Sequence, residues 1–201
     1  MPSGEEIQRY LAAALRLMTG RSDAVRMLDI SADGFWNSFF AIVVAGPVLV
    51  VGWVSAVKGL DGAPATLPGR IGLLLVFAAI DLATWIVPLV LLALVARPLG
   101  VSDRFVPYVV ASNWGSVITA WLSLPALLLA LLFGSRNDLA ATIGLVLFVV
   151  SLVLSWRLTN AVLNRGPGPA TAVFALSLVA GFATLFLLRG LVGLDGPQPS
   201  G

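Results

Sequence analysis

Two residue types that carry much of protein chemistry are missing from this chain of 201 residues, which contains no cysteine and no histidine. Their absence excludes disulfides, thiol nucleophiles, Ser-His-Asp triads, and cysteine- or histidine-ligated zinc, iron–sulfur and haem sites. The sequence also lacks glycine-rich phosphate-binding motifs, acidic clusters for a divalent metal and paired carboxylates at a catalytic spacing. We therefore predict that the chain is not an enzyme and uses neither a cofactor nor a metal.

Charge is also scarce, since charged residues make up 11% of the chain, against about 25% in a soluble domain. Hydrophobic residues make up 59%, and the mean hydropathy is +0.99. The net charge of +2 comes from 12 basic and 10 acidic residues, a balance that does not indicate a nucleic-acid partner. The composition predicts that most of the chain lies in lipid.

Five long apolar runs follow a more polar N-terminal segment, and each is near or above the roughly 20 residues needed to cross a bilayer. They cover residues 34–57, 71–96, 104–133, 139–160 and 170–192. Short connections rich in glycine and proline separate them, which favours antiparallel neighbours. The predicted fold is an all-α integral membrane protein, a five-transmembrane-helix bundle over 34–192 with a disordered tail over 193–201.

Residues 1–33 are predicted to form a short helical segment of their own. Ser3 and Glu6 have the spacing of a capping box, and Gly20 is expected to end the first helix. Apolar side chains recur at helical spacing on one side of it, at Ile7, Tyr10, Leu11, Ala14, Leu17 and Met18. Ser22 or Asp23 can cap a second short helix. The segment is either a solvated helical hairpin or an amphipathic helix in the headgroup plane, and we favour the second because a span follows directly.

The orientation follows from the basic residues near the ends of the predicted spans. Eight lie on the side of the N-terminus: Arg9, Arg16, Arg21, Arg26, Arg97, Arg104, Arg157 and Arg165. Four lie on the other side: Lys58, Arg70, Arg136 and Arg189. Since eleven of the 12 basic residues are arginine and alanine, leucine, valine and glycine abound, the composition suggests a GC-rich bacterial genome. We predict a multi-pass protein of the bacterial inner membrane with a cytoplasmic N-terminus.

Aromatic side chains mark both predicted interfaces. Phe35, Trp36, Phe39 and Phe40 cluster at the start of the first span, and Trp53 lies near its other end. Pro47 and Pro125 are expected to kink the first and third spans.

Asp81 is the one carboxylate well inside a predicted span, close to the midplane of 71–96. An ionisable group at that depth is costly, so it should face the bundle interior and find partners there. Thr84, Trp85 and Pro88 share its helix face. Two interpretations stay open: a proton- or ion-handling site, or a neutral aspartate hydrogen-bonded to a neighbouring helix.

The third span carries a stripe of small and hydroxyl residues, made of Tyr108, Ser112, Gly115, Ser116, Thr119 and Ser123. Asn113 lies at the edge of the stripe. At about 1.5 Å per residue, Ser116 and Thr119 lie at a depth similar to that of Asp81. We therefore expect an intramembrane polar site formed by Asp81, Thr84, Asn113, Ser116 and Thr119. The stripe itself has two interpretations. It allows close packing of helices, or it lines a hydrated path.

Arg157 and Asn160 share a face near the predicted cytoplasmic end of the fourth span. Arg157 is expected to reach lipid phosphate, and pairing with Asp81 is the alternative. In the fifth span, Ser177 and Gly181 have the spacing of a small-xxx-small helix contact.

Two segments resemble a known group of proteins. Residues 28–39 (LDISADGFWNSF) resemble the beginning of the first span, and residues 103–114 (DRFVPYVVASNW) that of the third span, in small five-span proteins of proteobacteria. That group has no established activity and is remotely similar to the Yip family of Ypt-interacting proteins. The resemblance implies a five-span architecture and transfers no functional residue.

The leading functional hypothesis is a non-enzymatic, Yip-like scaffold or accessory subunit of a membrane complex that acts through helix and lipid contacts. The expected partners are membrane lipids and either another protein or further copies of the chain. The alternative is a small proton- or solute-handling transporter or channel that uses Asp81 and the stripe. A lipid-modifying enzyme using Asp81 or Arg157 is a third and weaker hypothesis.

Overall fold

The computed structural model describes residues 1–60, 63–134 and 137–194 of the chain. Every regular element within these residues is a helix, and five helical segments are long and apolar enough to cross a membrane. The predicted all-α class with five candidate spans is therefore confirmed. Arg136 and residues 195–201 of the predicted tail lie outside the described residues. Gly193 and Leu194 continue the last helix as a hydrogen-bonded turn, so the predicted tail does not begin at 193.

The N-terminal segment contains α1 (Gly4–Met18) and the 3-10 helix η1 (Ser22–Met27). The capping box of α1 is confirmed, because Ser3 accepts from the Glu6 backbone and Glu6 accepts from the Ser3 backbone. Gly20 follows the helix with φ at +91°, a conformation that suits a residue without Cβ. The predicted cap of the second helix is wrong, because η1 begins after Arg21 without any side-chain cap.

The first span is divided into two helices, α2 (Ala32–Ser38) and α3 (Ala41–Lys58). Around Phe39 and Phe40 the backbone N–H groups bond to carbonyls three residues back, as in a 3-10 turn, which separates α2 from α3. The sequence predicted one continuous run over 34–57 with a kink at Pro47. Pro47 lies inside α3.

The other spans are α4 (Leu67–Val95), α5 (Phe105–Phe133), α6 (Asp138–Leu163) and α7 (Pro167–Leu191), with a 3-10 turn η2 (Ser102–Arg104) before α5. Three of them extend beyond the predicted ranges because local caps lengthen them. Thr66 caps α4 and Asn137 caps α6 through side-chain oxygens. Pro167 opens α7 at a position where a missing N–H costs nothing.

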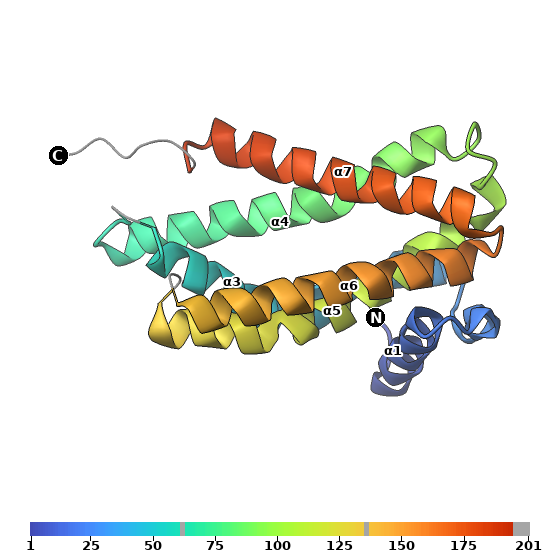
Figure 1. Cartoon of the computed structure of the whole chain (residues 1–201), viewed down its shortest axis with the longest axis horizontal. Coiled ribbons are helices and arrows are strands. Elements are labelled where there is room, and N and C mark those ends of the chain that lie inside the picture. The colour runs from blue at the N-terminus through green and yellow to red at the C-terminus, as the bar shows by residue number, and fades with distance from the viewer. Residues whose placement is uncertain (61–62, 135–136, 195–201) are drawn as a thin grey trace.

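The spans form two layers, which Figure 1 shows one above the other. One layer contains α4 and α7, and the other is a row of three helices with α5 between α3 and α6. Consecutive spans run antiparallel. The pairs α3–α4, α5–α6 and α6–α7 pack together as the short connections predicted, whereas the loop between α4 and α5 joins the two layers. We call the end of the bundle that carries α1 the α1 end, and the end that carries the α3–α4 loop the distal end.

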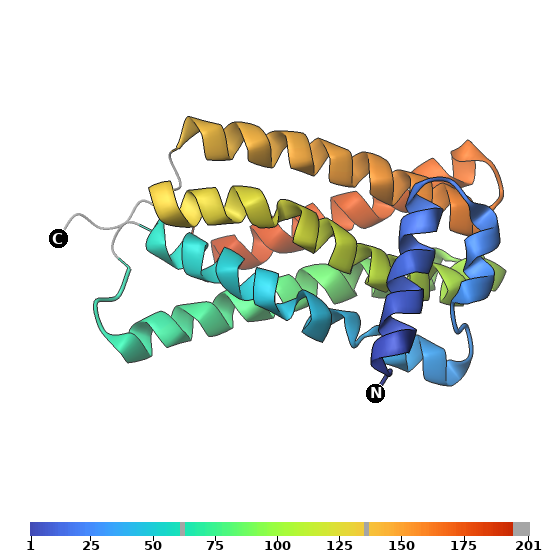
Figure 2. The same cartoon turned by 90° about the horizontal axis from the view of Figure 1, so that it is seen from below.

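Helix α1 runs across the spans at the α1 end and packs on α5 and α6, as Figure 2 shows. Its face toward the bundle is almost fully buried, at Tyr10, Ala13, Ala14, Leu17 and Met18. That face meets Trp114, whose ring centroid lies 5.3 Å from that of Tyr10. The helix is amphipathic as predicted, but its apolar face is covered by protein. Leu11 and Leu15, on another side of α1, line an open groove together with Val44 of α3 and Trp121 of α5.

The main hydrophobic core lies at the α1 end. Its buried residues come from α1, the beginnings of α3, α5 and α7, and the final turns of α4 and α6. Trp114 is the largest side chain that is fully buried among the described residues. Gly115 lies against Leu158 and Met18, so the small residue allows α1 and α6 to approach α5. The core therefore fixes one end of the bundle and the position of α1.

Candidate functional site

Asp81 lies in the middle of α4 and is half-buried. Its Oδ2 accepts a hydrogen bond of 2.6 Å from Nε1 of Trp53 on α3. The sequence placed Trp53 in an interfacial belt, and the structure turns its indole inward instead. In hydrocarbon an indole N–H needs an acceptor from the protein, which explains why it pairs with the carboxylate. The polar contact joins α3 to α4 near the midplane.

A cavity of about 290 Å³ adjoins Asp81 and opens between α3, α4, α5 and α7. Most of its walls are apolar, and Trp53 and Phe77 supply two aromatic rings. Ser123 of the predicted stripe and Arg189 of α7 are its other polar lining residues. The cavity places a carboxylate, a hydroxyl and a guanidinium around one space in the distal half of the bundle.

The hydroxyls of the stripe bond mainly to their own helix. Ser116 donates to the Ser112 carbonyl, Thr119 to the Ser116 carbonyl and Ser123 to the Ala120 carbonyl. Such back-bonding satisfies a hydroxyl donor without a second helix. Ser116 and Thr119 therefore do not donate to Asp81.

A second cavity, of about 240 Å³, lies between α5, α6 and α7 and collects hydroxyl groups from all three helices. Its polar lining residues are Tyr108, Ser112, Ser116, Ser151, Ser155, Thr159 and Ser177. Tyr108 and Ser177 form a hydrogen bond of 3.1 Å across it. We call this space the hydroxyl cavity. It lies closer to the α1 end than the cavity beside Asp81.

Asn113 is fully buried and belongs to a third polar cluster. Its Oδ1 accepts from Nε1 of Trp85 on α4 at 3.0 Å, and its Nδ2 donates to Oγ of Ser38 on α2 at 2.9 Å. Ser38 in turn donates to the Phe35 carbonyl. One amide thus links three helices at the α1 end, with each of its two ends satisfied.

Thr84 lies at the contact between α4 and α7. A Cβ placed on Gly181 would meet its methyl group at 3.8 Å, so this glycine permits the close approach of the two helices. The Thr84 hydroxyl is buried and has no hydrogen-bond partner among the described residues. Ser177 and Gly181, the predicted small-xxx-small pair, face α5 and α4 respectively.

The five residues expected to form one site are thus distributed over several places. Asp81 lines the distal cavity, Ser116 lines the hydroxyl cavity, and Asn113 belongs to the cluster with Ser38 and Trp85. The shared stripe still connects them, because Ser112 and Ser116 line one cavity and Ser123 lines the other. Helical spacing placed Asp81 and Thr84 on one face of the second span, and Ser116 and Thr119 in the stripe of the third, but could not say which neighbour each would meet.

Arg157 is exposed and contacts α1 rather than Asp81. Its Nη2 donates to the Thr19 carbonyl at the C-terminal end of α1, at 2.7 Å. A cation at this end also interacts favourably with the helix dipole. This contact places the guanidinium at the end of α1 rather than beside Asp81. Asn160 has a buried Oδ1 without a hydrogen-bond partner among the described residues, one turn from Arg157.

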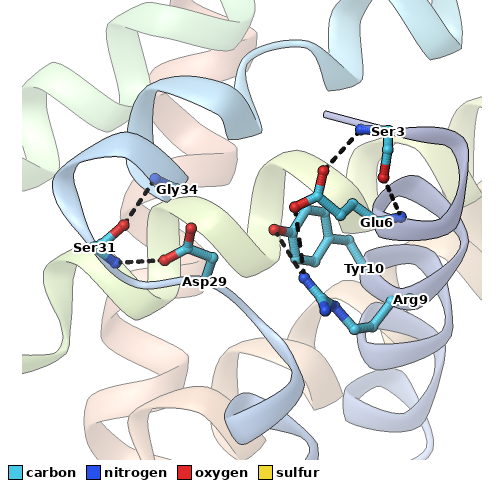
Figure 3. A network of polar contacts seen from close by, with 7 residues as sticks. All are labelled: Ser3, Glu6, Arg9, Tyr10, Asp29, Ser31 and Gly34. Atoms are coloured by element: carbon cyan, nitrogen blue, oxygen red, sulfur yellow. Dashed lines mark hydrogen bonds and ion pairs between the residues drawn. The ribbon is translucent and has the colours of Figure 1, made fainter. Parts of the chain in front are cut away.

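The segment that carried the first resemblance forms a compact turn before α2, drawn in Figure 3. Asp29 Oδ1 accepts from the Ser31 backbone, and Ser31 Oγ caps α2 by accepting from the Gly34 backbone. A Cβ on Gly34 would lie 2.2 Å from the Asp29 carbonyl oxygen, so only glycine fits there. Hydrogen bonds from Ser31 hold the pKa of Asp29 below its usual range.

The polar end of α1 lies beside this turn in Figure 3. Arg9 contacts Glu6 at 3.9 Å and donates to the Tyr10 hydroxyl at 3.3 Å. The backbone hydrogen bond from Ser3 lowers the pKa of Glu6, and Arg9 adds to this effect. Both carboxylates therefore stay ionised at neutral pH and stabilise the two turns that they cap.

The described residues contain no group of three or more histidine, cysteine, aspartate or glutamate side chains that could hold a metal ion. Comparison with known proteins finds no matching family model, no matching curated protein and no matching solved structure. The similarity to five-span proteobacterial proteins and to the Yip family stays a prediction from the sequence.

Proposed function

We propose that this multi-pass membrane protein is a non-enzymatic scaffold or accessory subunit of a membrane complex, acting through helix and lipid contacts. The observation that carries the proposal is the use of its interior polar groups. Asn113 and Tyr108 bond to other helices of the same chain, and each contact fixes helices relative to one another. Polar side chains used in this way build a rigid platform rather than a reacting centre.

A partner surface is also available in the distal half. Phe148 on α6 contacts Phe182 on α7, and Phe182 stacks on Phe186, with ring centroids 6.3 and 6.1 Å apart. All three rings are exposed. A partner helix would pack on this aromatic row in place of lipid tails.

Native purification in mild detergent, with mass spectrometry of protein and lipid in one sample, tests the proposal. We expect a stoichiometric partner protein, and a photo-crosslinking residue at Phe186 should capture it. The same crosslinker at Leu75, which is exposed on α4, is the matched control. A monodisperse chain without a partner, whose deletion has no phenotype, would contradict the proposal.

We also propose the bacterial inner membrane as the location, with the α1 end in the cytoplasm. The predicted excess of basic residues at that end supports it, eight against four in the sequence. Because the chain has no native cysteine, single cysteines at exposed positions can report sidedness. A membrane-impermeant maleimide added to spheroplasts should label Ala65→Cys at the distal end and spare Ser22→Cys at the α1 end. The reverse pattern would invert the orientation.

The cavity beside Asp81 favours a second candidate, a small proton- or solute-handling protein. A carboxylate half-buried near the midplane and bordered by open space can exchange a proton or hold a small polar solute. In proteoliposomes, Asp81→Asn should then abolish a proton flux that Asp138→Asn, a change at an exposed carboxylate of α6, leaves intact. Equal proton flux in the wild-type chain and in both variants would exclude a proton-handling function.

A further inference from the structure

A further cavity lies at the distal end, between the last turns of α3 and the first turns of α4. Its volume is about 730 Å³, within the usual range of ligand pockets. Seven of its nine lining residues are apolar: Val54, Val57, Leu60, Ala63, Leu67, Ile71 and Leu74. We call this space the distal slot.

Two cations complete the lining of the distal slot, Lys58 at the end of α3 and Arg70 at the beginning of α4. Lys58 donates to the Leu131 carbonyl at 2.9 Å, and Arg70 Nε donates to the Pro64 carbonyl at 3.0 Å. An ammonium has three donors and a guanidinium five, so each keeps donors for another acceptor. The described lining contains no carboxylate; Asp61 of the same loop lies outside the described residues.

The position of the slot suits an amphiphile. It lies where α3 ends and α4 begins, at the level where a span meets the headgroup region. The aliphatic walls offer an apolar surface to an acyl chain, and the two cations attract an anion at the mouth of the slot. A soluble anion would leave the aliphatic walls unused. A partner helix would require small residues for a close approach, whereas these walls are mainly valine, leucine and isoleucine.

We propose that the distal slot binds one acidic phospholipid, with an acyl chain along the aliphatic walls and the phosphate between Lys58 and Arg70. The two carbonyl contacts hold the cations in place, so the site is partly formed before the lipid arrives. The bound lipid fills the space between the end of α3 and the beginning of α4. This site is separate from the aromatic row and from the cavity beside Asp81.

Titration of phosphatidylglycerol into phosphatidylcholine nanodiscs that contain the full chain tests the charges of the site. The double variant Lys58→Gln with Arg70→Gln should weaken phosphatidylglycerol binding about 30-fold, because each cation near a membrane surface contributes about 1 kcal/mol. Arg21→Gln with Arg26→Gln removes two exposed cations at the α1 end and is the matched control. Equal weakening in both double variants would show general charge attraction and overturn the proposal.

A second pair of variants tests the slot itself and keeps both cations. Leu74→Trp fills the slot and should displace the lipid that copurifies with the chain, measured by lipid mass spectrometry. Leu75→Trp places the same ring on the next residue, which is 67% exposed to the bilayer, and should leave the copurified lipid unchanged. Retention of the acidic phospholipid by Leu74→Trp would overturn the proposal even if the charge variants behave as expected.

Discussion

The α1 end and the distal end are built from the same apolar helices, yet they differ in how tightly those helices close. The contiguous buried core lies at the α1 end, where α1 covers α5 and α6. The distal end contains the distal slot of about 730 Å³ and the Asp81 cavity of about 290 Å³. Apolar composition alone therefore does not decide where the bundle packs.

Polar and small residues account for the tighter packing of the helices at the α1 end. Lipid tails are as apolar as leucine, so helices gain little from burying leucine against leucine. At the α1 end, Asn113 links three helices, and Arg165 binds the Gly100 carbonyl and, at 2.7 Å, the Asp103 carboxylate. At the distal end, the described contacts between spans include those of Trp53 with Asp81 and of Lys58 with the Leu131 carbonyl. At the α1 end, specific polar contacts therefore add to the packing of the buried core.

Truncating Trp114, the central ring of the α1 end, should reduce the unfolding free energy the most. Trp114→Ala removes a fully buried side chain that packs on α1, and we expect it to cost about 3 kcal/mol of unfolding free energy. Leu127→Ala at the distal end should cost less than about 1 kcal/mol, because that side chain already borders a cavity. Unfolding by sodium dodecyl sulfate in mixed micelles measures both. Similar losses would contradict the contrast between the two ends.

A methyl group added to the turn before α2 should have the next largest effect. Gly34→Ala forces Cβ against the Asp29 backbone, so the turn must open, at a cost of about 2 kcal/mol. Gly46→Ala in α3 is the matched control, since no atom lies within 4 Å of its added Cβ. The same unfolding assay should find Gly46→Ala neutral or slightly stabilised. A neutral Gly34→Ala would show that the turn does not constrain α2.

Loss of the contact between Arg157 and α1 should make α1 open more often at the α1 end without unfolding the bundle. Arg157→Gln removes the hydrogen bond to the Thr19 carbonyl, which we expect to be worth about 1 kcal/mol at this exposed site. Hydrogen exchange of residues in α1 should become about 5-fold faster. Arg26→Gln, an exposed arginine of η1, is the control. Unchanged exchange in α1 would mean that its apolar face alone holds the helix.

Acid should produce the smallest effect, and only at the α1 end. The pKa values of Glu6 and Asp29 are lowered in the folded chain by hydrogen bonds from Ser3 and Ser31. Their stabilising effect is complete above the ordinary carboxylate pKa of about 4 and is lost as the pH falls through the lowered values. Hydrogen exchange at the start of α1 should therefore quicken below about pH 4. Glu6→Gln should remove most of this pH dependence, and a persistent dependence would point to other groups.

The sequence was sufficient for the parts of the fold that lipid enforces. Five apolar runs of spanning length had to become helices, because hydrocarbon leaves backbone groups no other partner. The capping box at Ser3 and the end of α1 at Gly20 followed from local chemistry. Asp81 was expected to turn away from lipid, and it does find a donor on a neighbouring helix.

The partners of the site residues could not be predicted in the same way. Spans that are apolar on all sides carry little information about their rotation, so the spacing of Asn113 and Ser116 could not reveal which helix each would face. The signal for Trp53 was present but was misread, because a tryptophan near a span end also fits an interfacial belt. The contact of Arg157 with Thr19 depends on the docking of α1, which no pattern within the fourth span encodes.

The contact between Thr19 and Arg157 also sets an order of events during synthesis. Helix α1 is complete about 140 residues before Arg157 is made, an interval of about 7 to 28 s at 5–20 residues per second. A helix of 15 residues is marginal alone in water, so during this interval it needs the membrane surface to shelter its apolar face. Helix α1 is thus synthesised well before Arg157, and it reaches its final contacts only when the fourth span is complete.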